Sequence, residues 1–269
     1  MAEPLVLANE RSGILRLTLH RPQKRNALTR ELLTELHQHL RGLAGRTDLR
    51  LVVLGATGTA FCAGMDLAQM QETAAHPDAS AIWQADTEIY RDVVQALFDC
   101  ACPTLAIVPG PAVAGGLGLV LACDLVVAAE TATFALPEPK RGITAAIVTP
   151  LLTYRVSPAA ASFLLLSGEA VDARQAQQMG FCHVVAPPDG LETAAQQVEQ
   201  SILSGAPGAL ATTKQLLQRC TASDIRAQLD SAVTVSAKAR ETAEAREGLQ
   251  AFLEKRPTVW TVDSESRTP

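Results

Sequence analysis

The segment VPGPAVAGGLGL, residues 108–119, joins one apolar run to another through a turn rich in glycine and proline. The spacing predicts a strand over 104–108, a tight turn, and a thoroughly apolar, hence buried, helix over about 116–122. A further apolar run over 125–129 predicts the next buried strand. A strand, a helix and a strand in succession favour an α/β core.

The turn before this apolar helix is also a candidate site. The start of a helix presents unpaired N–H groups and a positive dipole, which suit an oxyanion that develops during a reaction. No Gly-Lys-Ser/Thr follows the glycines, so the segment is not a phosphate-binding P-loop. Taken alone, the glycines could equally serve close packing of the helix.

Outward from this segment, strands are predicted mainly in the first half of the chain and helices mainly in the second. The predicted strands cover 14–20, 51–54, 104–108 and 125–129, and the upstream helices cover 29–43 and 82–101. Downstream helices are predicted to begin at Ser157-Pro158, to run from Asp172 to Gly180, and to cover 189–204, 207–219 and 223–256 with a break near Glu241. We therefore divide the chain into an α/β core, residues 1–200, and a helical C-terminal region, residues 201–269, that is available for packing against another subunit.

The composition excludes several classes of function. The chain is 48% hydrophobic with a net charge of −5, and no basic stripe with interleaved aromatic residues indicates nucleic acid as a partner. The longest apolar run, 117–129, is interrupted by Asp124 and too short to span a membrane. The six cysteines form no C-x-x-C pair, so we expect no metal site. The first residues lack the pattern of a signal peptide, and we expect a cytoplasmic protein.

Three further segments are candidates for chemistry. RPQKRNAL, residues 21–28, is a basic turn whose Lys24-Arg25 pair could meet phosphates or simply be solvated. GTAFCAGMDL, residues 58–67, has small residues that let the backbone approach a ligand, although a tight strand-to-helix turn explains them too. TFALPEPKRG, residues 133–142, holds Glu138 between two prolines, where poor hydration would raise the pKa of its carboxyl toward neutrality. Pairing of this glutamate with a neighbouring cation is the alternative.

In this order and spacing, the segments resemble the enoyl-CoA hydratase/isomerase (crotonase) superfamily. The resemblance runs through FCAGMDL, Gly115-Gly116, Cys123-Asp124 and Phe134…Glu138 to APGALATTKQLL and EGLQAFLEKRP near the end. It implies a crotonase-like spiral of ββα units with a helical C-terminal region that builds homotrimers, often paired as dimers of trimers. Coenzyme A would be part of the substrate, and no separate cofactor is expected.

The resemblance also implies roles for individual residues. The backbone N–H groups of Ala63 and Gly115 would form an oxyanion hole for the thioester carbonyl, and Glu138 would be the general acid/base. Substrate-binding residues would be Lys24, Arg25, Ala27, Ala63, Gly64, Met65, Asp66, Leu67, Gly115, Gly118 and Lys255, the last reaching the CoA of a neighbouring subunit.

One departure from the family bears on the substrate. Two-glutamate hydratases carry an acid three residues after the oxyanion glycine, where this chain has Gly118, and GITAAIVTPLL at 142–152 replaces a glycine-rich track. Both features resemble the methylglutaconyl-CoA and isohexenylglutaconyl-CoA hydratases, whose substrates carry a β-branch and a distal carboxylate. We expect Gly118 to remove a repelling charge and to leave room for the branch or for a water, while Lys140 or Arg141 offsets the substrate's charge.

We therefore expect an enoyl-CoA hydratase, a lyase, that acts on a branched, carboxylated thioester with a single glutamate. Three alternatives stay open: a Δ3,Δ2-enoyl-CoA isomerase, which needs one base and no bound water; a decarboxylase of a malonyl-like thioester; and an inactive protein that binds acyl-CoA with the same fold. Turnover of a panel of enoyl-CoAs separates them.

Overall fold

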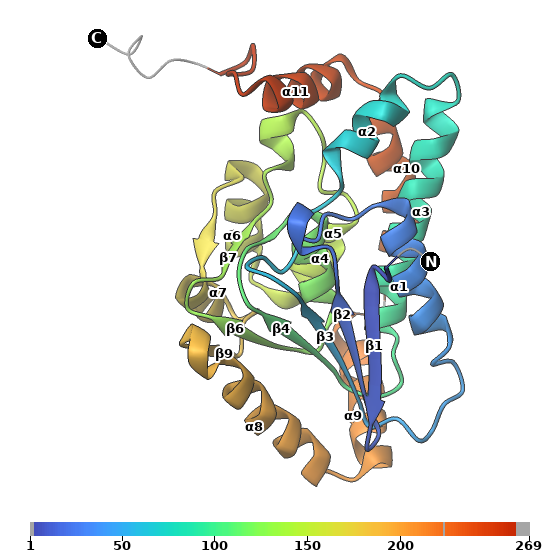
Figure 1. Ribbon diagram of the computed structural model, residues 1–269, viewed down its shortest axis with the longest axis vertical. Coiled ribbons are helices and arrows are strands. Elements are labelled where there is room, and N and C mark those ends of the chain that lie inside the picture. Colours follow the sequence, from blue (N-terminus) through green and yellow to red (C-terminus); the bar gives the residue numbers. More distant parts are fainter. Residues whose placement is uncertain (1–2, 223, 262–269) are drawn as a thin grey trace.

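The computed structural model describes residues 3–222 and 224–261 and is built around a six-stranded sheet (Figure 1). The strand order is β1-β2-β3-β4-β6-β9, in which β1 pairs antiparallel with β2 and all other neighbours are parallel. These strands are β1 (Val6–Arg11), β2 (Ile14–Leu19), β3 (Leu51–Ala56), β4 (Thr104–Val108), β6 (Leu125–Ala129) and β9 (Val184–Ala186). A small second sheet has the order β5-β7-β8 and consists of β5 (Ala112–Val113), β7 (Thr133–Ala135) and β8 (Val171–Asp172).

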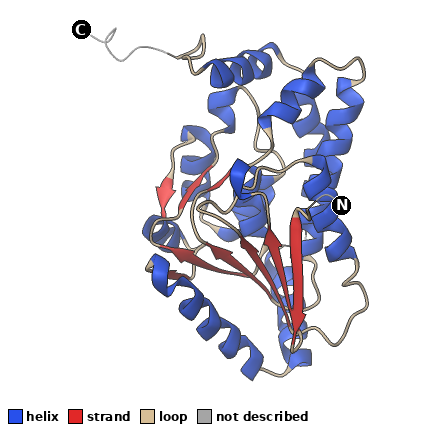
Figure 2. Ribbon diagram, viewed as in Figure 1, coloured by secondary structure: helices blue, strands red, loops and turns tan. Residues whose placement is uncertain are grey.

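Helices surround the large sheet and make up most of the second half of the chain (Figure 2). They are α1 (Arg30–Arg41), α2 (Leu67–Ala74), α3 (Ala79–Phe98), α4 (Gly115–Ala122), α5 (Val148–Arg155), α6 (Pro158–Ser162), α7 (Ala173–Met179), α8 (Leu191–Ser204), α9 (Pro207–Thr221), α10 (Ile225–Ala239) and α11 (Ala243–Glu254). Short turns of tighter or wider helix are η1 (Pro22–Lys24), η2 (Glu138–Arg141), η3 (Phe163–Ser167) and η4 (Pro188–Gly190).

The two faces of the large sheet are covered by different helices. Side chains alternate along each strand, so Leu51 and Val53 of β3 face one side and Val52 and Leu54 the other. The first side packs against α8, at the lower left of Figure 1, and the second belongs to the main core with α1, α3 and α4. Since parallel strands buried on both faces need apolar residues throughout, the short unbroken apolar runs of the sequence are explained.

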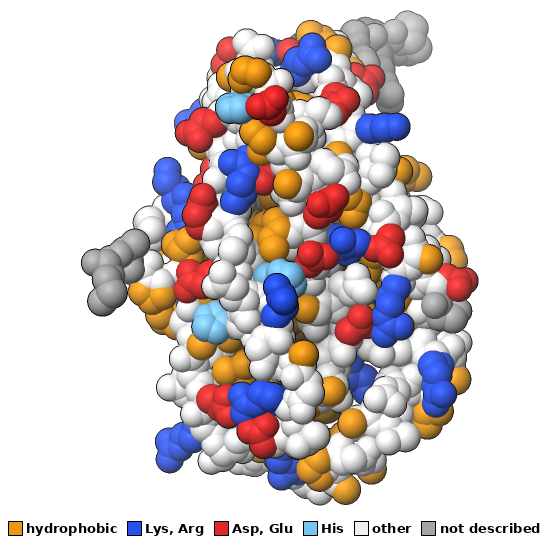
Figure 3. Space-filling model, turned by 90° about the vertical axis from the view of Figure 1, so that its right-hand side faces the viewer, with side chains coloured by type: hydrophobic (Ala, Val, Ile, Leu, Met, Phe, Trp, Pro, Cys, Tyr) orange, Lys and Arg blue, Asp and Glu red, His pale blue; other side chains and the backbone are white. Residues whose placement is uncertain are grey.

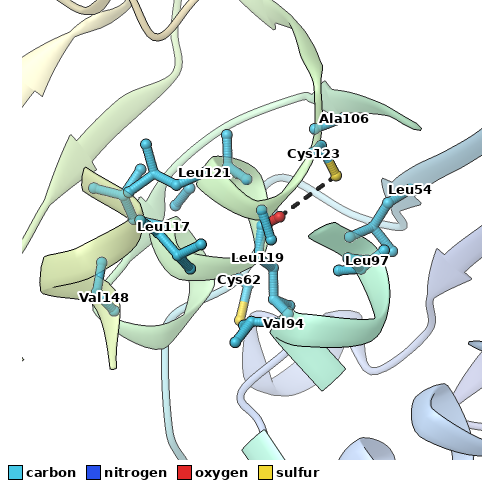
Figure 4. Packing of buried hydrophobic residues seen from close by; sticks show 14 of the residues in the cluster. Leu54, Cys62, Val94, Leu97, Ala106, Leu117, Leu119, Leu121, Cys123 and Val148 are labelled. Atoms are coloured by element: carbon cyan, nitrogen blue, oxygen red, sulfur yellow. Dashed lines mark hydrogen bonds between the residues drawn. The ribbon is translucent and has the colours of Figure 1, made fainter. Parts of the chain in front are cut away.

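Helix α4 lies inside the main core, and every residue from Gly115 to Ala122 is buried. Figure 4 shows its leucines packed among Val94 and Leu97 of α3 and Val148 of α5. Burying one leucine side chain contributes about 1.5–3 kcal/mol, so the core holds the start of α4 firmly in place. That start is the glycine-rich turn at the candidate site.

The C-terminal helices pack against the first part of the chain. Helix α10 lies along α3, and α11 contacts η2 and α2 at the top of Figure 1. Lys214 of α9 is buried, pairs with Asp124 at 2.7 Å and donates to the Cys102 carbonyl at 3.1 Å. The boundary predicted between residues 200 and 201 falls inside α8, whose Ala195 and Ile202 both pack on the sheet.

Most predicted elements are confirmed, including the half-buried strand at β2 and the capped helices at α6 and α7. Helix α5, which lies in the unusual stretch at 142–152, and the strands β1, β5, β7, β8 and β9 were not predicted. Acidic and basic side chains are interspersed on the face seen in Figure 3. Within 3–222 and 224–261, no helix is both long enough and apolar enough to cross a membrane.

Candidate active site

Asn26 is a fully buried polar residue that joins the basic turn to the following loop. Its Oδ1 accepts from the Arg21 N–H at 2.8 Å, and its Nδ2 donates to the carbonyls of Thr57 and Ala60 at 2.9 Å each. The two segments that the sequence placed far apart therefore lie side by side. Losing such a buried, fully bonded amide would leave several backbone groups unpaired.

Asp66, predicted to bind substrate, has two structural roles in the loop. Its carboxylate caps the start of α2 by accepting from the N–H groups of Ala68 and Gln69, and it pairs with Arg21 at 2.6 Å. These contacts fix the direction in which α2 leaves the loop. They leave its neighbours on either side, Met65 and Leu67, to line the cavity described below.

The second loop crosses the start of α4 at Gly64. Its φ of +88° favours glycine, and a Cβ placed there would lie 2.8 Å from the Ala114 Cβ and 3.6 Å from the Gly115 nitrogen. Ala114 itself has φ 54° and ψ −126°, a strained conformation for a residue with a side chain, and its N–H donates to the Ala135 carbonyl at 2.9 Å. The Gly115 N–H, just after it, finds no acceptor within the described chain. Gly115 thus has the free donor that an oxyanion hole requires.

Ala63 differs from the expectation. Its N–H donates to the Arg25 carbonyl at 3.0 Å, so it is not a free donor in this structure, and Ala63 is not among the residues that line the cavity. The reason is local: Arg25 adopts φ 50° at the end of η1, and its carbonyl lies within reach of the 58–67 loop. Ala63 can join an oxyanion hole only by exchanging this acceptor for the substrate oxygen.

Glu138 begins η2 and is buried, with 7% of its surface exposed. Its Oε2 is buried and has no hydrogen-bond partner among the residues that the structure describes. Burial raises the pKa of this carboxyl to about 7, while its own backbone N–H and the Arg141 charge lower it less. A carboxyl that is half ionised near neutrality, with a free oxygen, is suited to take up and return a proton.

Glu138 and Gly115 line one cavity. Most of its other lining residues are apolar, among them Met65, Leu67, Met70, Ile143 and Val148. Within the described residues that line it, Glu138 is the only carboxylate. The predicted catalytic carboxyl and the predicted glycine of the oxyanion hole are therefore brought together by the fold.

The space expected beside Gly118 is occupied by Tyr90 of α3. A Cβ at Gly118 would lie 2.0 Å from the Tyr90 hydroxyl and 3.1 Å from a Val148 methyl. That hydroxyl donates to the Gly115 carbonyl at 2.7 Å, and burial raises the pKa of Tyr90 well above its ordinary value. The expectation that Gly118 leaves room for a substrate branch or a water is wrong, because a tyrosine fills that room.

The predicted cations fall into two groups. Lys24 and Arg25 are exposed, and neither has a carboxylate partner in the part of the chain that the structure describes. Ala27, in the same turn, is half-buried and does not line the cavity. Lys255 ends α11 with φ 55° and is exposed, and its reach to a neighbouring subunit stays a prediction.

Of the two cations offered for the substrate's charge, only Arg141 lies at the cavity. Lys140 points elsewhere, since its ammonium pairs with exposed Glu169 at 2.6 Å. The Arg141 guanidinium lies 4.3 Å from the ring centre of Phe252. A second arginine, Arg240, lines the same cavity and was not predicted.

Comparison with known proteins identifies the family. Residues 9–263 match the model of the enoyl-CoA hydratase/isomerase family. The chain belongs to this family. The 2,3-dehydroadipyl-CoA hydratase of Escherichia coli K12 is 35% identical over 95% of the chain and 97% of its own length. The enoyl-CoA isomerase/hydratase fer4 of Mycosarcoma maydis is 32% identical over 94% of each.

Solved structures of family members confirm the α/β crotonase fold. A crystal structure of an enoyl-CoA hydratase from Mycobacterium avium superimposes with a TM-score of 0.85 at 33% identity, covering 97% of this chain and 100% of that one. The family's acyl-CoA chemistry is thereby established for the chain at the level of class.

Two residues of the site escaped the sequence reasoning, Tyr90 and Arg240. Both continue buried helical stripes: Tyr90 follows Trp83 and Thr87 on α3, and Arg240 follows Val233 and Ser236 on α10. A polar or charged residue on a core-facing stripe is the signal that could have found them.

Proposed function

We propose that this protein hydrates an enoyl-CoA whose acyl chain carries a distal carboxylate, with Glu138 as the acid/base. The observation that carries the proposal is the buried Glu138 carboxyl, whose Oε2 has no partner and whose pKa is about 7, in the cavity that Gly115 also lines. Within the family, these are the groups that thioester chemistry needs.

The reaction can be written with this single carboxylate. Ionised Glu138 takes a proton from water as the water oxygen bonds to the β-carbon of the substrate. The π electrons of the double bond move toward the thioester, and the resulting enolate oxygen accepts from the Gly115 N–H. Glu138 then returns the proton to the α-carbon and is regenerated as the carboxylate. Removal of one oxyanion donor typically costs about 2.7–4 kcal/mol of transition-state stabilisation.

Two observations support a carboxylated acyl chain. The E. coli relative is named for 2,3-dehydroadipyl-CoA, an acyl group with a terminal carboxylate. The cavity also holds two arginines and a single carboxyl, an excess of positive charge. The branched methylglutaconyl-CoA and isohexenylglutaconyl-CoA stay within this class, although Gly118 no longer provides a reason for the branch.

For the nucleotide part of CoA, we propose the exposed Lys24-Arg25 turn. Neither cation is paired with a described carboxylate, and the turn is fixed by Asn26 beside the loop that leads to the cavity. Phosphates bound there would leave the thioester near the crossing of Gly64 and Gly115.

A Δ3,Δ2-enoyl-CoA isomerase is the second candidate. Tyr90 fills the position where two-glutamate hydratases place the second acid, and isomerisation needs only one base. The relative from Mycosarcoma maydis carries both activities in its name.

The deciding experiment supplies matched 2-enoyl and 3-enoyl CoA thioesters, with and without a terminal carboxylate, in H₂¹⁸O. A hydratase yields 3-hydroxyacyl-CoA labelled with ¹⁸O, fastest from the carboxylated 2-enoyl substrate. Conversion of the 3-enoyl to the 2-enoyl thioester without label establishes the isomerase. No turnover and no exchange of the α-proton with solvent, despite binding, would identify an inactive acyl-CoA-binding protein.

A further inference from the structure

The cavity that holds Glu138 contains more positive than negative charge. Apart from Tyr90, the ionisable residues that line it are Glu138, Arg141 and Arg240. Since the pKa of Glu138 is about 7, its carboxyl is neutral in about half of the molecules near pH 7. Charges removed from water are costly unless they are paired. The imbalance therefore favours a ligand that brings a negative charge of its own.

Arg240 is the cation without a partner. It follows the last turn of α10 and is buried, with 9% of its surface exposed. Its Nη1 is buried and has no hydrogen-bond partner within residues 3–222 and 224–261. Asp86 is close enough to raise the pKa of Arg240 electrostatically, but burial lowers that pKa more. Both carboxylate oxygens of Asp86 are bonded to Arg30, at 2.5 and 2.9 Å.

Arg240 lies where the cavity with Glu138 adjoins a second, apolar cavity. It lines both the cavity with Glu138 and an adjoining small apolar cavity bounded by Trp83 and Phe252. The two cavities share the lining residues Leu67, Met70, Arg141, Ile143 and Arg240, so they adjoin along this wall. An acyl chain whose thioester lies at Gly115 would extend past Glu138 toward this shared wall.

Arg141 has a different position on the same wall. Its guanidinium covers the ring of Phe252 in a cation–π contact, which ties η2 to α11. Its charge also acts on Glu138. Arg141 thus already has an aromatic partner and an acidic neighbour, whereas the guanidinium of Arg240 has neither a hydrogen bond nor a salt bridge within the described residues.

We propose that Arg240 binds the distal carboxylate of the acyl chain and so selects dicarboxylic over monocarboxylic acyl-CoA. The inference rests on the proposed function, because it names the residue that recognises the distal carboxylate of the proposed substrate. A guanidinium offers a planar fork of donors that matches a carboxylate with two parallel hydrogen bonds. The distal carboxylate of the ligand and the buried Arg240 guanidinium would then form an ion pair.

The test measures binding of acyl-CoAs that cannot react. Isothermal titration calorimetry compares glutaryl-, adipyl- and pimelyl-CoA, each with its terminal amide, and free CoA, on the wild-type protein and on Arg240→Met and Arg240→Lys. Lys238→Met is the matched control, since it removes the same charge from an exposed position in the last turn of α10, two residues before Arg240. Thermal unfolding of each variant shows that it is folded.

The wild type should prefer at least one dicarboxylic thioester over its amide by roughly 10- to 100-fold, the range for a hydrogen-bonded buried charge. Arg240→Met should lose that preference, Arg240→Lys should keep part of it, and Lys238→Met all of it. Binding of the amides and of free CoA should change by less than about threefold. Because Arg240 has no partner to lose, Arg240→Met should melt no lower than the wild type.

Three results would overturn the inference. The wild type binds acid and amide alike, or Arg240→Met keeps the preference, or Arg240→Met weakens free CoA as much as glutaryl-CoA, which would place a CoA phosphate on Arg240. Failure of the proposed hydratase is recognised separately. In that case the preference for a dicarboxylic thioester over its amide still depends on Arg240, but no 2-enoyl-CoA is converted to an ¹⁸O-labelled 3-hydroxyacyl-CoA.

Discussion

Replacement of Glu138 by glutamine should stabilise the folded protein at alkaline pH, because the wild-type carboxyl is ionised there and burial makes its charged form unfavourable. In the unfolded chain this carboxyl titrates at its ordinary pKa of 4.5, and in the folded protein at about 7. Between these values the folded state binds more protons than the unfolded state, so the free energy of unfolding falls as pH rises from 4.5 to 7. The difference between the two pKa values corresponds to about 3 kcal/mol of unfolding free energy, at about 1.4 kcal/mol per pKa unit.

The glutamine side chain does not titrate, so the variant does not show this fall in the free energy of unfolding as the pH rises. Urea unfolding of both proteins should show that the advantage of Glu138→Gln over the wild type grows by about 3 kcal/mol between about pH 4 and pH 8. Any cost of placing an amide in the site is the same at both pH values and cancels. Glu88→Gln, at an exposed position of α3, is the control and should show no such trend. An advantage that is equal at both ends of this pH range would refute the argument that Glu138 is held in a poorly hydrated site.

Three further predictions concern the surroundings of Glu138. Gly118→Ala should destabilise the protein by about 1–3 kcal/mol, because the new Cβ overlaps the Tyr90 hydroxyl. Adding Tyr90→Phe should restore part of this loss in the double variant. Additive losses of the two substitutions in chemical unfolding would contradict the contact. The variant Lys24→Ala/Arg25→Ala should raise KM for every CoA thioester more than it lowers kcat, whereas an unchanged KM would place the nucleotide elsewhere. The pH profile of kcat/KM should rise through an apparent pKa of about 7, since water activation needs the ionised Glu138, and a rise near 4.5 would exclude that assignment.

The sequence predicts the fold well where apolar periodicity is strong. The strand at β2, the helix that Thr29 caps and the buried helix after Gly115 are all confirmed. The strands β5, β7 and β8 have two or three residues each, too few for a period to show. Helix α5 begins without a side-chain cap and has apolar residues on several sides. The sequence therefore shows neither a start signal nor a helical periodicity for this helix.

The site is only partly predictable, because its decisive contacts join residues distant in sequence. Glu138 is found from its apolar, proline-bounded segment, and Gly115 from the turn before a buried helix. That Tyr90 fills the space at Gly118 depends on how α3 packs against α4, which no local pattern contains. The same holds for Arg240, whose helix lies far from Glu138 in the chain and reaches the cavity only through its packing against α3.

The central claim is that Glu138 moves the proton in the chemistry of a CoA thioester. The most direct measurement compares steady-state kinetics of the wild type and Glu138→Gln on a carboxylated 2-enoyl-CoA, together with the dissociation constant of a saturated dicarboxylic acyl-CoA for each. We predict that kcat falls by about 10²- to 10⁴-fold while the dissociation constant changes little, since glutamine keeps the shape of the side chain and cannot exchange the proton. A variant that binds the thioester normally and retains most of its activity would contradict this account.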